Sequence, residues 1–290
     1  MSIFNLPAWI RPHLYTGKNY DSLTEADIAD LRERLKRFQA DAPEISVMIP
    51  AWNEQNNIFR TLSSLAANTT ARAVEIVVIN NNSTDRTQEL LDRIGVRNVL
   101  QPEQGTPHAR QLGLQVAGGK FHLCADSDTF YPPTWMEYMV RPMERNSEIV
   151  GVYGRYSFMP GLGQSRLPYY LYEKVAGLLI RVRKRNREHI NFLGLNMGFV
   201  TEVARRTTGF QVSQVRKFDN ALGSDYFVDE AEDGKMAVNL KTQGRLQLVT
   251  GDKTRAFTSS RRLIAEGGIV QSFKNRLKLH LSRVSEYVKG

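Results

Sequence analysis

The sequence predicts an α/β fold with a mostly parallel central sheet and helices on both of its faces. Short apolar runs alternate with amphipathic stretches from residue 45 onwards, and the connections between them are short. Polar clusters follow several of the apolar runs. This alternation is typical of β-α-β units, whose strands lie parallel in one sheet.

The first half of the chain carries this pattern most regularly. We expect strands at residues 45–50, 74–79, 96–100 and 120–125, and helices at residues 57–67, 85–94 and 106–117. In such sheets, ligands bind at the carboxyl ends of the strands. Three polar clusters lie at these ends, at residues 52–54, 80–85 and 126–128. The functional site is therefore expected at this edge of the sheet.

The N-terminal segment is expected to form an irregular arm over residues 1–20, followed by a packing helix over 22–38. Ser22 would cap that helix, with Glu25 as its capping-box partner. In the second half, we expect strands at residues 148–154, 196–201 and 245–250, and helices at 167–187, 230–242 and 263–288. The predicted division is an arm and helix over 1–43, a main domain over 44–260 with halves 44–130 and 131–260, and a basic helical tail over 261–290.

The composition excludes several classes of site. The 290 residues include one cysteine, Cys124, which rules out an intrachain disulfide and a zinc site with several thiolates. Cys124 lies in an apolar run and is expected to be buried. The formal net charge of +9 favours polyanionic partners. Because we find no signal peptide and no spanning apolar stretch, we expect a cytoplasmic protein, soluble or peripheral on the cytoplasmic membrane face.

Asp126-Ser127-Asp128 follows the fourth expected strand and is the strongest candidate metal site. Two carboxylates one residue apart at a strand end can face the same hard cation. Proteins hold Mg²⁺ and Mn²⁺ with carboxylate oxygens together with substrate phosphates. Such a metal neutralises a diphosphate leaving group. The alternative is a solvated turn in which the aspartates cap backbone groups.

Two further clusters suggest chemistry. Glu232 and Asp233 form an acidic pair, and a carboxylate of this kind can take a proton from an attacking hydroxyl. The alternative is the acidic first turn of a helix, which the helix dipole favours. Asn81 or Asn82 can pair with the edge of a nucleobase, because an amide both donates and accepts. Ordinary loop chemistry is the alternative there.

Taken together, these segments resemble the family 2 glycosyltransferases, whose GT-A fold has a Rossmann-like sheet. The likeness lies in the segments VMIPAWNE (47–54), IVVINNNSTDRT (76–87), GTPHAR with later small residues (105–118), DSD (126–128), NMGF with GF (196–199 and 209–210) and EDG (232–234). It covers about residues 45–240, and the segments occur in the family's order.

The resemblance implies an inverting enzyme that moves a sugar from a nucleoside-diphosphate-sugar donor to a hydroxyl of a glycan or lipid-linked acceptor, in cell-envelope or polysaccharide synthesis. Asp126 and Asp128 would hold Mn²⁺ or Mg²⁺, with Asp128 as the direct ligand. Asp233 would be the general base, with Glu232 beside it. The residues expected to line the nucleotide-sugar site are Pro50, Ala51, Asn53, Glu54, Asn81, Asn82, Asp85, Arg110, Asp126, Ser127, Asp128 and Arg261.

Three of these expectations depend on particular residues of this chain. Arg261 lies in a Ser-Ser-Arg-Arg segment, and a guanidinium suits diphosphate oxygens, although the start of a basic helix is an equal alternative. Asn80 and Asn81 stand where many family members carry aspartate, so the base of the donor stays open. Lys235 stands where an acidic residue is frequent, which affects the acceptor side.

Two basic amphipathic stretches, residues 169–185 and 273–284, raise the question of membrane contact. Such helices can lie on anionic bilayers, or can pack their apolar side on the core. Alternative functions are a non-catalytic nucleotide-sugar-binding relative and a basic protein that binds nucleic acid or a membrane surface. We find no nucleic-acid-binding motif, and the basic residues are spread along the chain, so nucleic acid is not an expected partner.

Overall fold

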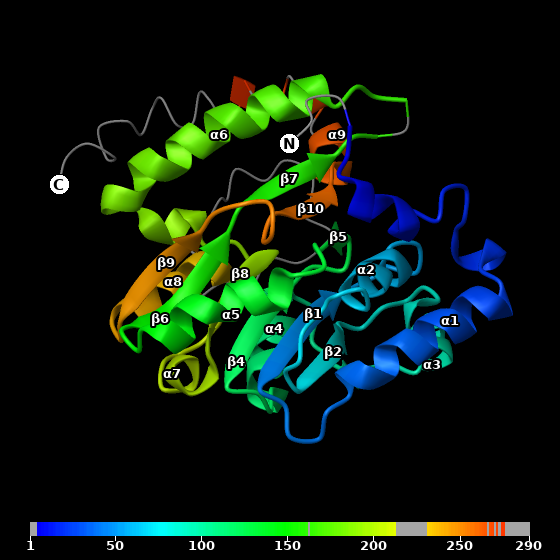
Figure 1. The fold of residues 1–290 in the computed structure, drawn as a ribbon, viewed down its shortest axis with the longest axis horizontal. Helices are drawn as coiled ribbons and strands as arrows, with labels where there is room; N and C mark the ends of the chain where they lie inside the picture. Colours follow the sequence, from blue (N-terminus) through cyan, green and yellow to red (C-terminus); the bar gives the residue numbers. More distant parts are fainter. Residues whose placement is uncertain are drawn as a thin grey trace.

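The structure is a computed structural model that describes residues 5–161, 163–212, 231–265, 267–269, 271 and 274–275. Its main sheet has seven strands in the order β3-β2-β1-β4-β8-β6-β9 (Figure 1). These strands are β1 Ile45–Ala51, β2 Val74–Asn80, β3 Arg97–Leu100, β4 Phe121–Ala125, β6 Ile149–Gly154, β8 Asn196–Val200 and β9 Arg245–Val249. Only β8 is antiparallel to its two neighbours, which confirms the mostly parallel sheet.

Helices cover both faces of this sheet, as the alternating pattern predicted. Val47 and Ile49 of β1 belong to a core cluster with α1 Glu25–Leu35, α2 Ile58–Leu65, α3 Thr87–Ile94 and α5 Trp135–Arg145. Met48, between them, packs instead against α4 Thr106–Val116. Alternate side chains of a strand point to opposite faces, so β1 is buried on both sides. Cys124 of β4 is fully buried, as expected, and burial raises its thiol pKa to about 12.

The helix α5 was not predicted from the sequence. It buries Trp135, Met136, Met139 and Val140, but Pro142 lies inside it and two prolines precede it. Because proline is unfavourable in a helix interior, the residue propensities predict no helix here. The packing of the buried side chains stabilises α5 nevertheless. The short helix α7 Thr201–Arg205 was also missed. The strand expected over 196–201 ends at Val200, and α7 begins at the next residue.

A second sheet was missed altogether. Its three strands are β5 Thr129–Phe130, β10 Ala256–Ser259 and β7 Tyr156–Met159, in the order β5-β10-β7. Each is two to four residues long, and its partners lie far away in sequence. Pairing places Thr258 opposite Thr129, and the Ser259 amide donates to the Asp128 carbonyl at 3.2 Å. The start of α9 Arg261–Ala265 is thereby brought next to the acidic tripeptide after β4.

The N-terminal segment, residues 5–43, is more ordered than the sequence suggested. It contains the 3-10 turns η1 Ala8–His13, η2 Tyr20–Ser22 and η3 Lys36–Phe38, and α1 lies before η3. The predicted cap was wrong: Thr24 caps α1, with Asp27 as its capping-box partner, because Ser22 already belongs to η2.

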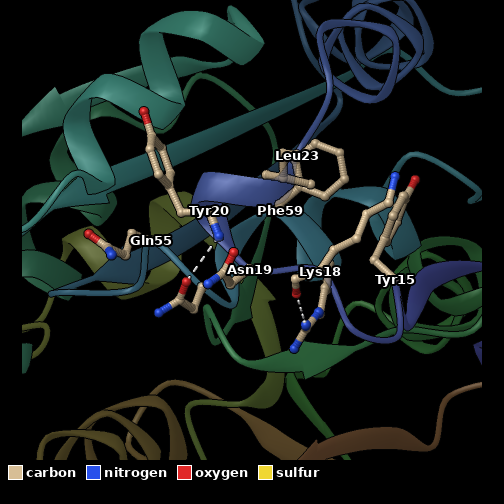
Figure 2. A pocket seen from close by; sticks show the side chains of 9 residues that line it. Tyr15, Lys18, Asn19, Tyr20, Leu23, Gln55 and Phe59 are labelled. Atoms are coloured by element: carbon tan, nitrogen blue, oxygen red, sulfur yellow. Dashed lines mark hydrogen bonds between the residues drawn. The ribbon is translucent and has the colours of Figure 1, made fainter.

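The N-terminal segment is hydrogen-bonded to the loop that follows β1 and to α2. The Tyr20 amide donates to the side chain of Asn56, and Arg60 donates to the Lys18 carbonyl. Figure 2 shows Tyr20 and Lys18 of the N-terminal segment close to Gln55 and Phe59. The space between these residues measures about 10 Å³, which is no more than one water needs. This contact therefore supports the loop and offers no ligand cavity.

The remaining helices are α6 Leu167–Asn186, the turn η4 Glu188–Asn191 and α8 Glu232–Lys241. In Figure 1, α6 runs across the top of the view, above β7. A buried ion pair between Arg166 and Glu173 ties α6 down, because Glu173 also accepts from Ser157 of β7. The helix predicted over 263–288 lies largely outside the described residues. Within the described part of the chain, no helix is long and apolar enough to cross a membrane.

Candidate active site

The acidic tripeptide after β4 is held in place by buried hydroxyl groups. The Asp126 amide donates to the Tyr131 hydroxyl at 2.8 Å, and that hydroxyl donates to the Leu195 carbonyl at 2.8 Å. The Thr61 hydroxyl, on α2, donates to the Ser127 carbonyl at 2.9 Å. These bonds fix the backbone of the tripeptide, and therefore the positions from which the two aspartate side chains extend.

Asp128, Glu54 and Arg261 meet at this edge of the sheet, although they come from three distant parts of the chain. One guanidinium nitrogen of Arg261 donates to Glu54 Oε1 at 2.7 Å and to Asp128 Oδ2 at 2.8 Å. Burial raises the pKa of Glu54, and the positive charge of Arg261 opposes that shift. All three residues were predicted from the sequence to line the nucleotide-sugar site. The fold brings Glu54 and Asp128 into contact with Arg261, and their contact with a nucleotide remains a prediction.

Asn53 and Asp85 brace the loops after β1 and β2. Asn53 Oδ1 accepts from the Thr84 amide at 2.8 Å. Asp85 accepts from the Thr87 amide at 2.9 Å and from the Gln55 amide at 3.3 Å. Asn53 adopts a φ of 53°, in the left-handed region that asparagine tolerates. These side chains join two loops, and their predicted contact with a nucleotide remains a prediction.

Asn81 and Asn82 have different surroundings. The Asn81 side chain is buried, donates to the Glu103 carbonyl at 2.7 Å and accepts from the Gly105 amide at 2.9 Å. The backbone amide of Asn81 donates to the Ala51 carbonyl at 2.8 Å. Asn82 is exposed, with a left-handed φ of 60°. Pro50 and Ala51 end β1 beside β2, in register with Ile79 and Asn80.

Arg110, on α4, joins the two acidic motifs. Its Nη2 donates to Asp126 Oδ1 at 2.7 Å, and its Nε lies 3.6 Å from Glu232 Oε1. The side chain is only 5% exposed. Within the described residues, its Nε and Nη1 have no hydrogen-bond partner. The backbone of Gly194 presses on the guanidinium so closely that a Cβ there would lie 2.2 Å from Nη2.

Asp233 lies at the start of α8, next to Glu232. Its two oxygens accept from the Gly194 amide at 3.2 Å and from the Gly234 amide at 2.7 Å. Burial, and then the negative charge of Glu232, raise the pKa of Asp233 to about 6, whereas the charge of Arg110 opposes the shift. A carboxyl with this pKa is ionised at neutral pH and still accepts a proton readily, as general-base chemistry requires.

The residues present fit a divalent metal completed by substrate. Asp126 and Asp128 supply hard oxygen donors, and Mg²⁺ is commonly bound through one or two carboxylates plus substrate phosphates. No group of three or more acidic, histidine or cysteine side chains that could hold a metal occurs among the residues that the structure describes. The Arg261 guanidinium pairs with Asp128 at 2.8 Å, so this carboxylate already has a positively charged partner.

Sequence reasoning missed three residues that shape the site. Tyr131 and Thr61 hold the backbone of the acidic tripeptide, and Gly194 contacts both Arg110 and Asp233. Tyr131 could have been suspected, because it closely follows the acidic motif in a run of apolar residues. Thr61 and Gly194 carry no local signal, since their partners lie more than 35 residues away in sequence.

The chain matches the family model described as glycosyl transferase family 2 over residues 46–205, which is more than half of its length. It is 30% identical over 118 residues to an uncharacterized glycosyltransferase of Haemophilus influenzae, covering 39% of this chain and 36% of that protein. It is 29% identical over 115 residues to a poly-beta-1,6-N-acetyl-D-glucosamine synthase of Staphylococcus aureus, covering 38% and 28%. The matched part therefore spans about a third or less of these relatives.

A solved structure with the same fold is glucosyl-3-phosphoglycerate synthase from Mycobacterium tuberculosis, in complex with Mn²⁺, uridine diphosphate and phosphoglyceric acid. The TM-score is 0.53 at 18% identity, and the match covers 88% of this chain and 82% of that one. The same enzyme with Mn²⁺, uridine-diphosphate-glucose and glycerol 3-phosphate gives a TM-score of 0.52 at 19% identity, covering 88% and 83%. At this level of identity, the likeness shows the shared fold.

Proposed function

We propose that this chain, which belongs to glycosyl transferase family 2, moves a sugar from a nucleoside-diphosphate-sugar to an acceptor hydroxyl with inversion at the anomeric carbon. One observation carries the proposal: two acidic motifs more than 100 residues apart meet on Arg110. Asp126 and Glu232 contact the same buried guanidinium, at 2.7 and 3.6 Å. We infer that the donor-side carboxylates and the base-side carboxylates serve one site.

Asp126 and Asp128 would hold Mn²⁺ or Mg²⁺, which when bound neutralises the negative charge of the departing diphosphate. Glu54, Asn82 and Arg261 would contact the donor beside them. Asn53, Asn81 and Asp85 support this side by fixing the loops that carry it. The solved structures with this fold contain Mn²⁺ and uridine diphosphate, so these are the first probes to use.

Asp233 would act as the general base. The acceptor oxygen attacks the anomeric carbon from the side opposite the diphosphate, and its bond to that carbon forms as the bond from carbon to diphosphate oxygen breaks. The hydroxyl proton passes to the Asp233 carboxylate, and the nucleoside diphosphate leaves with the electron pair. Backbone amides of Gly194 and Gly234 hold the carboxylate for this step, and holding both reactants in line lowers the barrier further.

This assignment gives each part of the main domain a task. Residues 44–130 would bind the nucleotide-sugar, and residues 131–260 would supply the base and the acceptor side. The relatives named above include a polysaccharide synthase, which supports a glycan acceptor in cell-envelope or polysaccharide synthesis.

An acceptor linked to lipid would place the enzyme at a membrane surface. Leu171, Val175 and Leu178 lie on one face of α6, at a spacing of four and three residues, and are 57%, 38% and 61% exposed. The end of α6 reads Arg-Val-Arg-Lys-Arg-Asn over 181–186. An exposed apolar stripe followed by cations suits an anionic bilayer. Sedimentation with phosphatidylglycerol vesicles should fall for Leu171→Glu and stay unchanged for Val238→Glu, another exposed apolar site, on α8.

The proposed reaction is tested by release of nucleoside diphosphate from a panel of sugar donors, with Mn²⁺ and a membrane glycolipid extract as acceptor. We expect one donor to be consumed by the wild type, and not by Asp128→Ala or Asp233→Asn. If either variant turned over at the wild-type rate, the assigned site would be wrong.

A further inference from the structure

Arg261 occupies one of the two carboxylates that the metal would need, that of Asp128. Its guanidinium bridges Glu54 Oε1 and Asp128 Oδ2, at 2.7 and 2.8 Å. The second oxygen of Asp128 has only distant partners, the Thr129 hydroxyl at 3.4 Å and the Thr258 hydroxyl at 3.5 Å. Arg261 is thus the principal partner of Asp128 among the described residues.

This bridge consists of one cation and two carboxylates with unequal freedom to move. The side chains of Glu54 and Asp128 are 12% and 21% exposed, whereas that of Arg261 is 51% exposed. Glu54 has a further partner, Asn57 Nδ2 at 2.6 Å, which stays if Arg261 leaves. The backbone before Arg261 is fixed by the pairing of β10 with β5 and β7. A change of partner therefore needs only a rotation of the arginine side chain.

We propose that Arg261 and the divalent metal compete for Asp128, and that the diphosphate of the donor ends this competition by taking the guanidinium. The inference rests on the proposed function, because it needs a diphosphate beside the metal. A guanidinium pairs with phosphate oxygens as readily as with a carboxylate, so the ion pair is exchanged and no charge is left unpaired. Arg261 then has two successive partners, Asp128 before binding and the diphosphate after it.

Competition of this kind makes metal and nucleotide bind as a pair. Metal alone must displace Arg261 and leave its charge without the Asp128 partner, so it binds weakly. Metal with a diphosphate offers the arginine a new partner and binds tightly. By linkage, each ligand raises the affinity of the other by the same factor, and such couplings are typically about 5- to 150-fold.

The test is direct titration of Mn²⁺, alone and with saturating uridine diphosphate, into wild type and Arg261→Gln. Free Mn²⁺ is followed by electron paramagnetic resonance, so no catalytic turnover is needed. We expect the variant to bind Mn²⁺ alone about 5-fold or more tightly than the wild type, and to lose most of the enhancement that the nucleotide gives. Arg261→Lys should lie between the two, since it keeps the charge and loses the planar fork.

Arg245→Gln is the matched control, because Arg245 is also an exposed arginine and pairs with Glu148. It lies at the start of β9, at the end of the sheet opposite the site. This variant should titrate like the wild type. Unchanged or weaker binding of Mn²⁺ alone to Arg261→Gln would overturn the competition. If the wild type bound no nucleotide, the proposed function would fail, while the titration with Mn²⁺ alone would still test the competition.

Discussion

The two sides of the candidate site use polar residues in different ways. On the side formed by the loops after β1 and β2, Asn53, Asn81 and Asp85 direct their hydrogen bonds at neighbouring backbone. On the other side, Arg110 is a buried cation paired with Asp126, and Asp233 is a half-buried carboxyl whose pKa is raised by its surroundings. The first side is built by hydrogen bonds that fix loops, and the second holds electrostatic groups ready for chemistry. A polar cluster at a strand end therefore indicates the place of a site, but not the task of each residue in it.

The largest effect is expected at the second side, from Asp233→Asn. The amide keeps the shape of the side chain but cannot take a proton, so turnover should fall about 10²- to 10⁴-fold. Nucleotide affinity should stay unchanged, because Asp233 contacts only Gly194 and Gly234 in the hydrogen bonds observed. Equal losses in nucleotide binding and turnover would place Asp233 in the donor site instead.

The pH dependence of the wild type sharpens the same point. Burial and Glu232 raise the pKa of Asp233 to about 6, and the base works only when it is ionised. Turnover should therefore be full above this pH and should fall about tenfold per pH unit below it. The measurement is kcat/KM against pH, because this ratio reports the pKa of the base in the free enzyme. A rate that stays flat down to pH 5 would contradict the assignment of Asp233 as base.

A smaller effect is expected from Gly194→Ala, which disturbs the centre of the second side. The new Cβ would lie 2.2 Å from Arg110 Nη2, so the guanidinium must move away from Asp126. Overpacking of this kind costs about 1–3 kcal/mol of stability, and both donor affinity and turnover should fall. Gly177→Ala, on α6, is the control, because its Cβ would meet nothing within 4 Å. If the two variants melted at the same temperature and had the same activity, the close approach at Gly194 would be unimportant.

Effects no larger than these should distinguish Asn81 from Asn82 on the first side. Asn81→Ala removes a buried amide and leaves the Gly105 amide without its acceptor, which costs about 1–3 kcal/mol in the free energy of unfolding. Asn82→Ala removes an exposed side chain and should leave stability nearly unchanged while weakening nucleotide binding. Chemical denaturation and nucleotide titration of both variants measure the two effects. The reverse pattern would mean that Asn82 is the scaffold and Asn81 the ligand contact.

The sequence predicted the regular first half of the fold well, because each strand and helix there has its own apolar pattern that can be recognised locally. β1 to β4 and α2 to α4 lie close to their expected ranges. The second sheet could not be predicted, since Phe130 and Phe257 pair only after the chain has returned from a distance. The acidic motifs were recognised by residue type, but their meeting on Arg110 depends on tertiary packing that no local pattern encodes. Gly194 was missed for the same reason.

The central claim is a donor site in which metal and nucleotide meet at Asp128. Its most direct test is calorimetric titration of a panel of nucleoside diphosphates, with and without Mn²⁺, into wild type and Asp128→Ala. We predict that one nucleotide binds tightly to the wild type, that it requires Mn²⁺, and that Asp128→Ala abolishes this binding. Tight binding that persists without metal, or in Asp128→Ala, would contradict the account.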